Sequence, residues 1–152
     1  MQSTILLIHA TSQNIALFCC AMFAGATTYI GLVEQPTIVR AGRELTGAYI
    51  LLAQPRPAIF QISFAVIGAS AGIVAGITGN AAWWFAGGVA LGLTALFHQV
   101  VVMPETRRLL EIALNANDDD NIDANLLKKL SRLHAAESLA GMAALFMFIY
   151  RS

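Results

Sequence analysis

Residues 59–77 read IFQISFAVIGASAGIVAGI, a run of nineteen residues without a charged side chain. At about 1.5 Å of rise per residue, a helix of this length crosses about 30 Å of hydrocarbon. The run lacks the period-two alternation of a β-barrel strand and is too long to be one. It therefore predicts a transmembrane α-helix.

Three further apolar runs have a similar length, at residues 15–33, 83–103 and 133–150. Of the 152 residues, 57% are hydrophobic and 12% are charged, whereas a soluble domain has about 25% charged residues. We therefore predict one all-α membrane domain, a four-helix transmembrane bundle whose outer surface contacts the lipid bilayer. The formal net charge of +0 provides no basic stripe, so a nucleic-acid partner is not expected.

The basic residues predict the orientation of the bundle. Loops 34–58 and 104–132 hold eight of the nine lysines and arginines, namely Arg40, Arg43, Arg56, Arg107, Arg108, Lys128, Lys129 and Arg132. Because basic loops stay in the cytoplasm, we expect these two loops on the cytoplasmic side and both termini on the non-cytoplasmic side. The N-terminal stretch lacks the basic residues of a secretory signal, so the first span should be retained.

An acidic segment, residues 117–123, interrupts the second of these loops. Its sequence, NDDDNID, offers the oxygen ligands that calcium prefers, but it lacks the glycine and the distal glutamate of an EF-hand loop. We expect a solvated turn, in which Asn121 or Asp123 caps the helix that becomes the last span.

Small residues recur at every fourth position of the second span, at Gly68, Gly72 and Gly76, and again in the third at Gly88 and Gly92. Helices in lipid associate by close approach of their backbones, which such residues permit. The pattern fits packing between spans of one monomer. A seam for a homodimer or for a larger membrane complex through these glycine faces is the less favoured alternative.

Ionisable side chains are rare within spans because each is costly in hydrocarbon, so they are candidates for function. Five lie near the predicted cytoplasmic ends of the spans: Glu34, His98, Glu105, His134 and Glu137. His98 and Glu105 are seven residues apart, so they share one face of the third span. His134 and Glu137 are three residues apart, so they are neighbours on one face of the fourth span. Tyr29, near the end of the first span, either lines the same pocket or faces lipid.

Three functions fit this cluster. Structural ion pairs would fix the bundle. A polar pocket would let a histidine and a carboxylate exchange protons with a lipophilic small molecule. A metal site would use His98, Glu105, His134 and Glu137 to hold a single ion such as iron or copper, although only the fourth span offers the Glu/His pair of carboxylate-bridged bundles, and in reversed order.

Three segments carry a resemblance to a known family. Residues 25–36 read GATTYIGLVEQP, residues 103–109 read MPETRRL and residues 133–136 read LHAA. They resemble the Gly…Tyr…Val-Glu-x-Pro, Met-Pro-x-Asn-x-x-Leu and Leu-His elements of the anthrone-oxygenase-like family, a domain-of-unknown-function family of small four-span membrane proteins. Its named fungal relatives oxidise anthrones to anthraquinones with dioxygen and no added cofactor. The family is mostly bacterial, so the resemblance implies a bacterial inner membrane.

The matched positions are Glu34, Pro36 and His134, and two positions depart from the family pattern. Thr106 stands where the family usually has asparagine, and Glu137 stands where it usually has arginine. These two departures favour a role in proton transfer or metal binding over the assumption that this chain carries out the family's anthrone oxidation unchanged.

We predict a cofactor-independent oxygenase or oxidoreductase that acts on an apolar aromatic or quinol-like substrate. His134, assisted by Glu34 or Glu137, would be the catalytic base, and Tyr29, His98 and Glu105 would line the substrate pocket. The alternatives are a non-catalytic small subunit of a larger membrane complex and a metal-binding four-helix membrane protein.

Overall fold

The computed structural model describes residues 2–34, 36–37, 55–115 and 124–150. The elements in chain order are α1 (Gln2–Tyr29), the π-helical segment η1 (Ile30–Glu34), α4 (Pro55–Thr78), α5 (Ala82–Phe97), the π-helical segment η2 (His98–Val102), α6 (Met103–Asn115) and α7 (Ala124–Ile149). Within these ranges there is no strand, which confirms the all-α prediction. The acidic segment 117–123 and most of loop 34–58 lie outside the described residues.

Four helices are long and apolar enough to cross a membrane, at Gln2–Glu34, Ala58–Thr78, Ala82–Leu109 and Lys128–Ile149. Their number agrees with the four predicted spans. The first helix begins thirteen residues before the predicted span, because Ser12, Gln13 and Asn14 lower the hydropathy there without breaking the helix. The third continues through η2 into α6, because most residues from Glu105 to Leu114 are good helix formers.

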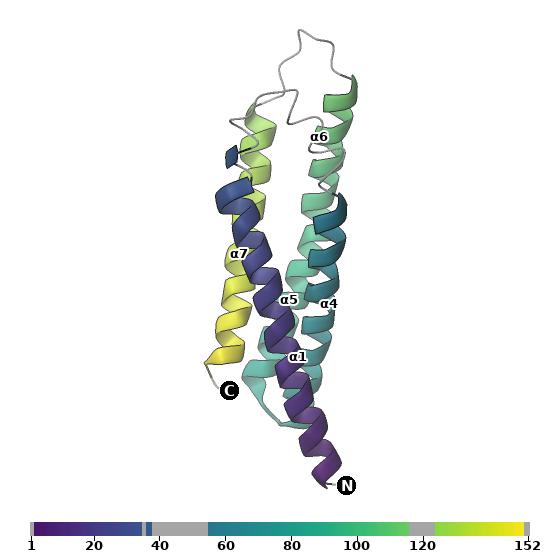
Figure 1. The fold of residues 1–152 in the computed structure, drawn as a ribbon, viewed down its shortest axis with the longest axis vertical. Helices are drawn as coiled ribbons and strands as arrows, with labels where there is room; N and C mark the ends of the chain where they lie inside the picture. The colour runs from purple at the N-terminus through teal and green to yellow at the C-terminus, as the bar shows by residue number, and fades with distance from the viewer. Residues whose placement is uncertain (1, 35, 38–54, 116–123, 151–152) are drawn as a thin grey trace.

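The four long helices surround a common core. Each packs against its neighbour in the chain, α1 on α4, α4 on α5 and α5 on α7, and α7 closes the ring against α1 (Figure 1). The start of α1 and the end of α7 lie at the same end of the bundle (Figure 1), as four crossings require. We call this the terminal end and the opposite one the loop end. Which end faces the cytoplasm remains a prediction from the basic residues.

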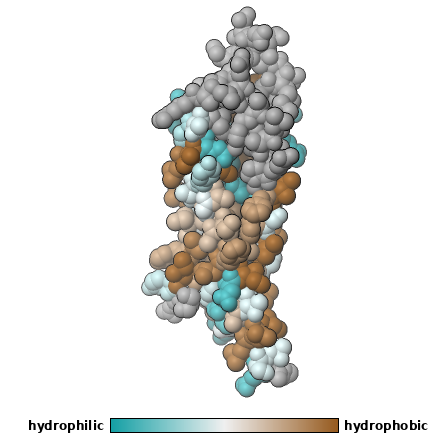
Figure 2. All heavy atoms as spheres, viewed as in Figure 1, coloured by the Kyte–Doolittle hydropathy of each residue, from teal (hydrophilic) through white to brown (hydrophobic). Residues whose placement is uncertain are grey.

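The outer surface is apolar. Leu32, Leu139 and Val100 are more than two-thirds exposed, at 74%, 72% and 70%. On the face drawn in Figure 2, apolar side chains spread along the length of the described part of the bundle. A soluble monomer rarely exposes such a surface. It suits contact with lipid chains.

Close backbone contact between α4 and α5 explains the glycine pattern. A Cβ on Gly88 would lie 2.7 Å from the Ile73 nitrogen and 2.8 Å from the Ala69 oxygen. A Cβ on Gly72 would lie 2.8 Å from the Phe148 ring. These glycines therefore pack within the monomer, and a second copy or a larger complex would have to bind another face.

Candidate functional site

Three of the predicted residues meet inside the loop half of the bundle. His98, His134 and Glu137 are 3%, 5% and 0% exposed. The Nδ1 of His98 lies 2.7 Å from Oε1 of Glu137 in a hydrogen bond, and the Nδ1 of His134 lies 3.3 Å from Oε2 of the same carboxylate. A buried charge is tolerated only when it is paired and hydrogen-bonded. The carboxylate has one hydrogen bond, to His98, and a second imidazole beside its other oxygen.

The short contact to Glu137 determines which nitrogen of His98 is available for chemistry. When Nδ1–H donates to the carboxylate, Nε2 keeps its lone pair and can accept a proton. Among the described residues, Nε2 of His98 and both ring nitrogens of His134 are buried without a hydrogen-bond partner. Glu137 therefore orients His98 more firmly than His134, which it approaches without a hydrogen bond.

The backbone changes its helical form at this site. His98 is the first residue of η2, and Met103 donates its N–H to the His98 carbonyl, five residues back. Each π segment is followed two residues later by a proline, Pro36 after Glu34 and Pro104 after Val102. A proline inside a helix clashes with the carbonyl four residues earlier, and a widened turn moves that carbonyl aside.

Threonines near these prolines donate hydrogen bonds to carbonyls of the π segments. The Thr106 hydroxyl donates to the Val102 carbonyl at 3.0 Å, and the Thr37 hydroxyl donates to the Val33 carbonyl at 2.6 Å. Both π segments contact α7, the helix of His134 and Glu137. Short π segments often occur at functional sites, so the irregular turns mark this part of the bundle independently of its titratable groups.

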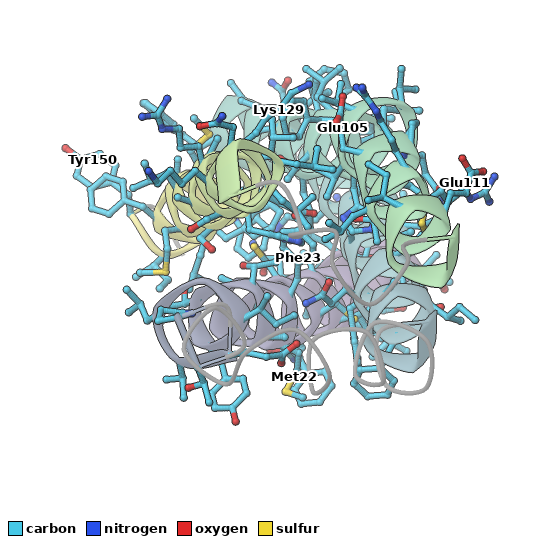
Figure 3. All side chains as sticks on the ribbon, turned by 90° about the horizontal axis from the view of Figure 1, so that it is seen from above. Met22, Phe23, Glu105, Glu111, Lys129 and Tyr150 are labelled. Atoms are coloured by element: carbon cyan, nitrogen blue, oxygen red, sulfur yellow. The ribbon has the colours of Figure 1, made fainter. Side chains whose placement is uncertain are left out.

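Glu105 and Tyr29 do not join the buried cluster. Glu105 binds Lys129 of α7 at 2.5 Å, and the two residues lie beside one another when the bundle is seen from above (Figure 3). Lys129 precedes Glu137 by eight residues, so this pair lies about 12 Å farther along the helix. The Tyr29 side chain is 58% exposed on the outer surface, so it does not line an interior pocket. Glu34 ends η1 and is partly buried.

The predicted metal set is not assembled. In the part of the chain that the structure describes, no group of three or more His, Cys, Asp or Glu side chains is arranged to hold a metal ion. The reason is geometric, since Glu137 separates the two imidazoles instead of converging with them on one point. Glu105 is directed to Lys129.

An open groove of about 450 Å³ lies on the outer side of η2 and α6. It is lined by Gln99, Met103, Pro104, Arg107, Arg108 and Glu111. Gln99 follows His98 directly but is exposed, whereas His98 points into the bundle. The groove is therefore separate from the buried cluster.

Three residues with buried polar atoms were given no role in the sequence analysis. Gln61 of α4 is 3% exposed. Its Nε2, the Thr28 hydroxyl of α1 and the Ser138 hydroxyl of α7 are buried without a hydrogen-bond partner in the described ranges. The feature of the sequence that could have identified Gln61 is a glutamine inside a mostly apolar run. Its inward direction depends on the packing of α4.

The chain matches no protein-family profile, no curated protein and no solved structure. The resemblance to the anthrone-oxygenase-like family therefore stays a prediction that rests on residues 25–36, 103–109 and 133–136.

Proposed function

We propose that this protein is an integral membrane oxidoreductase of the oxygenase type, in which His98, held by Glu137, removes a proton from a lipophilic aromatic substrate. The observation that carries the proposal is the buried 2.7 Å contact between His98 and Glu137, with Nε2 of His98 left without a partner among the described residues. The base is thus His98 rather than His134, which the sequence had favoured.

The carboxylate has two roles in this mechanism. Before the reaction it holds His98 in the tautomer that presents a basic Nε2. After Nε2 has taken the proton, the negative charge of Glu137 stabilises the imidazolium, as in other carboxylate–histidine pairs. His134 lies against the second oxygen of the same carboxylate and limits its rotation.

The proposed chemistry needs only substrate, base and dioxygen. A methylene group that is conjugated with a ketone through an aromatic ring loses a proton to His98, and the resulting carbanion passes one electron to dioxygen. The two radicals combine into a peroxide anion, which takes the proton back from His98. Loss of water then leaves a carbonyl, so that one CH₂ group and one O₂ become one C=O group and one H₂O. The substrate supplies all the electrons.

The basic residues support a cytoplasmic position for the site. Arg107, Arg108, Lys128, Lys129 and Arg132 all lie in α6 and α7 toward the loop end. By the positive-inside rule this end faces the cytoplasm and the termini face the opposite side. In a bacterium the protein would reside in the inner membrane, with a substrate that reaches it from the lipid.

The test compares two histidines of the same chain. In purified proteoliposomes, we expect the protein to convert anthrone to anthraquinone with uptake of one O₂ per substrate. Loss of a general base typically costs about 10²–10⁴-fold in rate, so His98→Ala should reduce the reaction at least 100-fold. His9→Ala, at the terminal end, is the matched control and should keep it. Wild-type protein no faster than empty liposomes, or His98→Ala at the wild-type rate, would end the proposal.

The other two functions considered from the sequence have no specific observation in their favour. A non-catalytic subunit was expected to bind its complex through the glycine faces, yet Gly68, Gly72 and Gly88 pack inside the monomer. A metal-binding protein would need a convergent ligand set, and the described residues hold no such group.

A further inference from the structure

All four spanning helices direct a polar side chain into the bundle near His98. In the described chain, the buried atoms without hydrogen-bond partners include Thr28 Oγ1 on α1, Gln61 Nε2 on α4, His98 Nε2 on η2 and Ser138 Oγ on α7. Their positions along the bundle follow from the register of the helix contacts, first between α4 and α5 and then between α1 and α7.

The glycine contacts between α4 and α5 give the register of this antiparallel pair. A Cβ on Gly76 would meet Phe85, and a Cβ on Gly68 would meet Leu91 at 2.9 Å. In an antiparallel pair, each step backward on one helix matches a step forward on the other. Gln61 stands seven residues before Gly68, and His98 stands seven residues after Leu91, so the two lie level.

The same reasoning applies to α1 and α7. A Cβ on Gly141 would lie 3.6 Å from the Ala24 Cα. Thr28, four residues beyond Ala24, therefore lies level with Glu137, four residues before Gly141. A Cβ on Gly31 would be 3.8 Å from Ser138 Oγ, an ordinary contact, which confirms that these helices still face each other there.

Unpaired donors and acceptors at one level of a membrane bundle need an occupant. Hydrocarbon contains no water to bind them, and a buried polar group without a partner is destabilising. Gln61 is the most informative of the group because an amide nitrogen only donates. It requires an acceptor, and an oxygen atom of the ligand can be that acceptor.

We propose that Gln61 forms a second polar pole of the site and donates a hydrogen bond to the oxygen of an aromatic carbonyl substrate. This inference rests on the proposed function and adds to it a residue that recognises the carbonyl oxygen of the substrate. Gln61 and His98 lie level on neighbouring helices, so a flat ring bound between them would turn its oxygen toward Gln61 and its acidic C–H toward His98.

Gln61 and His98 act together during proton removal. When His98 takes the proton, negative charge moves through the ring to the carbonyl oxygen, where the Gln61 N–H is already placed. Donors that face a developing oxyanion lower the barrier because they need no reorganisation. Gln61 is therefore a residue that determines specificity for carbonyl compounds and also stabilises the enolate.

Binding of two rings of the same shape tests this role without requiring turnover. Radiolabelled anthraquinone and anthracene share a three-ring frame, and only the first has oxygen atoms. On immobilised protein in nanodiscs, after subtraction of empty nanodiscs, wild type should bind anthraquinone about 10-fold more tightly than anthracene. Gln61→Met, which conserves length, should lose this preference and still bind anthracene. Ser63→Ala should behave as wild type, because that serine is exposed and bonded to its own backbone.

The outcomes separate the two proposals. Retention of the ketone preference in Gln61→Met, or its absence in wild type, would overturn the role of Gln61. His98→Ala should keep the binding preference while losing oxidation. If wild-type protein shows the preference but no oxidation, the carbonyl site stands and the oxygenase proposal falls. Anthracene binding by Gln61→Met shows that the variant is folded.

Discussion

The two ends of the bundle use histidine in opposite ways. At the terminal end, Nδ1 of His9 lies 3.0 Å from the Ala75 carbonyl and 3.3 Å from the Thr78 hydroxyl. A Cβ on Gly79 would lie 2.1 Å from its ring, so the imidazole rests directly on the backbone at the end of α4. At the loop end, His98 instead bonds a buried carboxylate. One histidine binds a carbonyl and a hydroxyl in the last turn of a helix, and the other is the base of the proposed reaction.

The helices also pack more tightly at the terminal end than at the loop end. Near the terminal end, a Cβ on Gly76 would lie 2.5 Å from the Phe85 nitrogen, and Trp84 stacks on Phe148 with ring centroids 5.0 Å apart. Near the loop end the helices pass through π-helical turns, and Gly31 has room for a methyl group. The terminal end therefore holds the helices together, and the loop end carries the irregular geometry and, Trp84 Nε1 apart, the buried polar atoms without a partner in the described residues.

The largest expected effect concerns the carboxylate at the loop end. Glu137→Gln keeps the shape of the side chain but removes the charge that stabilises a protonated His98. Loss of the equivalent charge in a carboxylate–histidine pair costs roughly 10³–10⁴-fold in kcat, and we expect a fall of that order in anthrone oxidation.

Glu105→Gln is the matched carboxylate control for this experiment. Glu105 pairs with Lys129, whose side chain is 53% exposed, and such exposed pairs contribute at most about 1 kcal/mol. The rate of anthrone oxidation by Glu105→Gln should stay within a few-fold of the wild-type rate. Equal losses in the two variants would contradict the distinction between a buried catalytic carboxylate and a peripheral one.

The next effect concerns packing, and two glycines allow a direct comparison of the ends. Gly76→Ala forces α4 and α5 apart because the new methyl group meets backbone atoms of Phe85. Overpacking of this kind costs about 1–3 kcal/mol. Reversible unfolding in mixed micelles should show that loss for Gly76→Ala and a much smaller change for Gly31→Ala. A larger loss for Gly31→Ala would reverse the assignment of the tight and open ends.

The smallest effect concerns the histidine at the terminal end. His9→Ala removes its bond to the end of α4, and a hydrogen bond of this kind is worth about 1 kcal/mol. We expect a slightly lower thermal denaturation midpoint in detergent and unchanged oxidation. A large loss of oxidation in this variant would show that the two ends are coupled, and that His9 cannot serve as a neutral control.

Most of the fold could be predicted from the sequence because a bilayer permits few solutions. Apolar runs such as residues 59–77 must be helical, since hydrocarbon cannot satisfy an open backbone. The start of α1 could not be predicted from hydropathy, because Ser12, Gln13 and Asn14 are polar and yet compatible with a helix.

The candidate site was predicted less completely. The sequence indicated that His98, His134 and Glu137 belong together, but it also included Tyr29 and Glu105. It placed the base at His134, where the proposed function places it at His98. Which histidine bonds Glu137 depends on how α7 sits against η2. In η2 a wider turn shifts the following side chains from the positions that α-helical periodicity predicts.

The sequence by itself determined the four apolar helices, the concentration of basic residues in two loops and the presence of titratable groups in the last two spans. Those features follow from local chemistry, the solvent preference of each side chain and the length of each run. Only the tertiary structure decided that His98 bonds Glu137, that Gln61 lies level with them and that Glu105 turns to Lys129. These contacts depend on two proline-linked π turns and on helix register, and the register arises from packing between segments far apart in the chain.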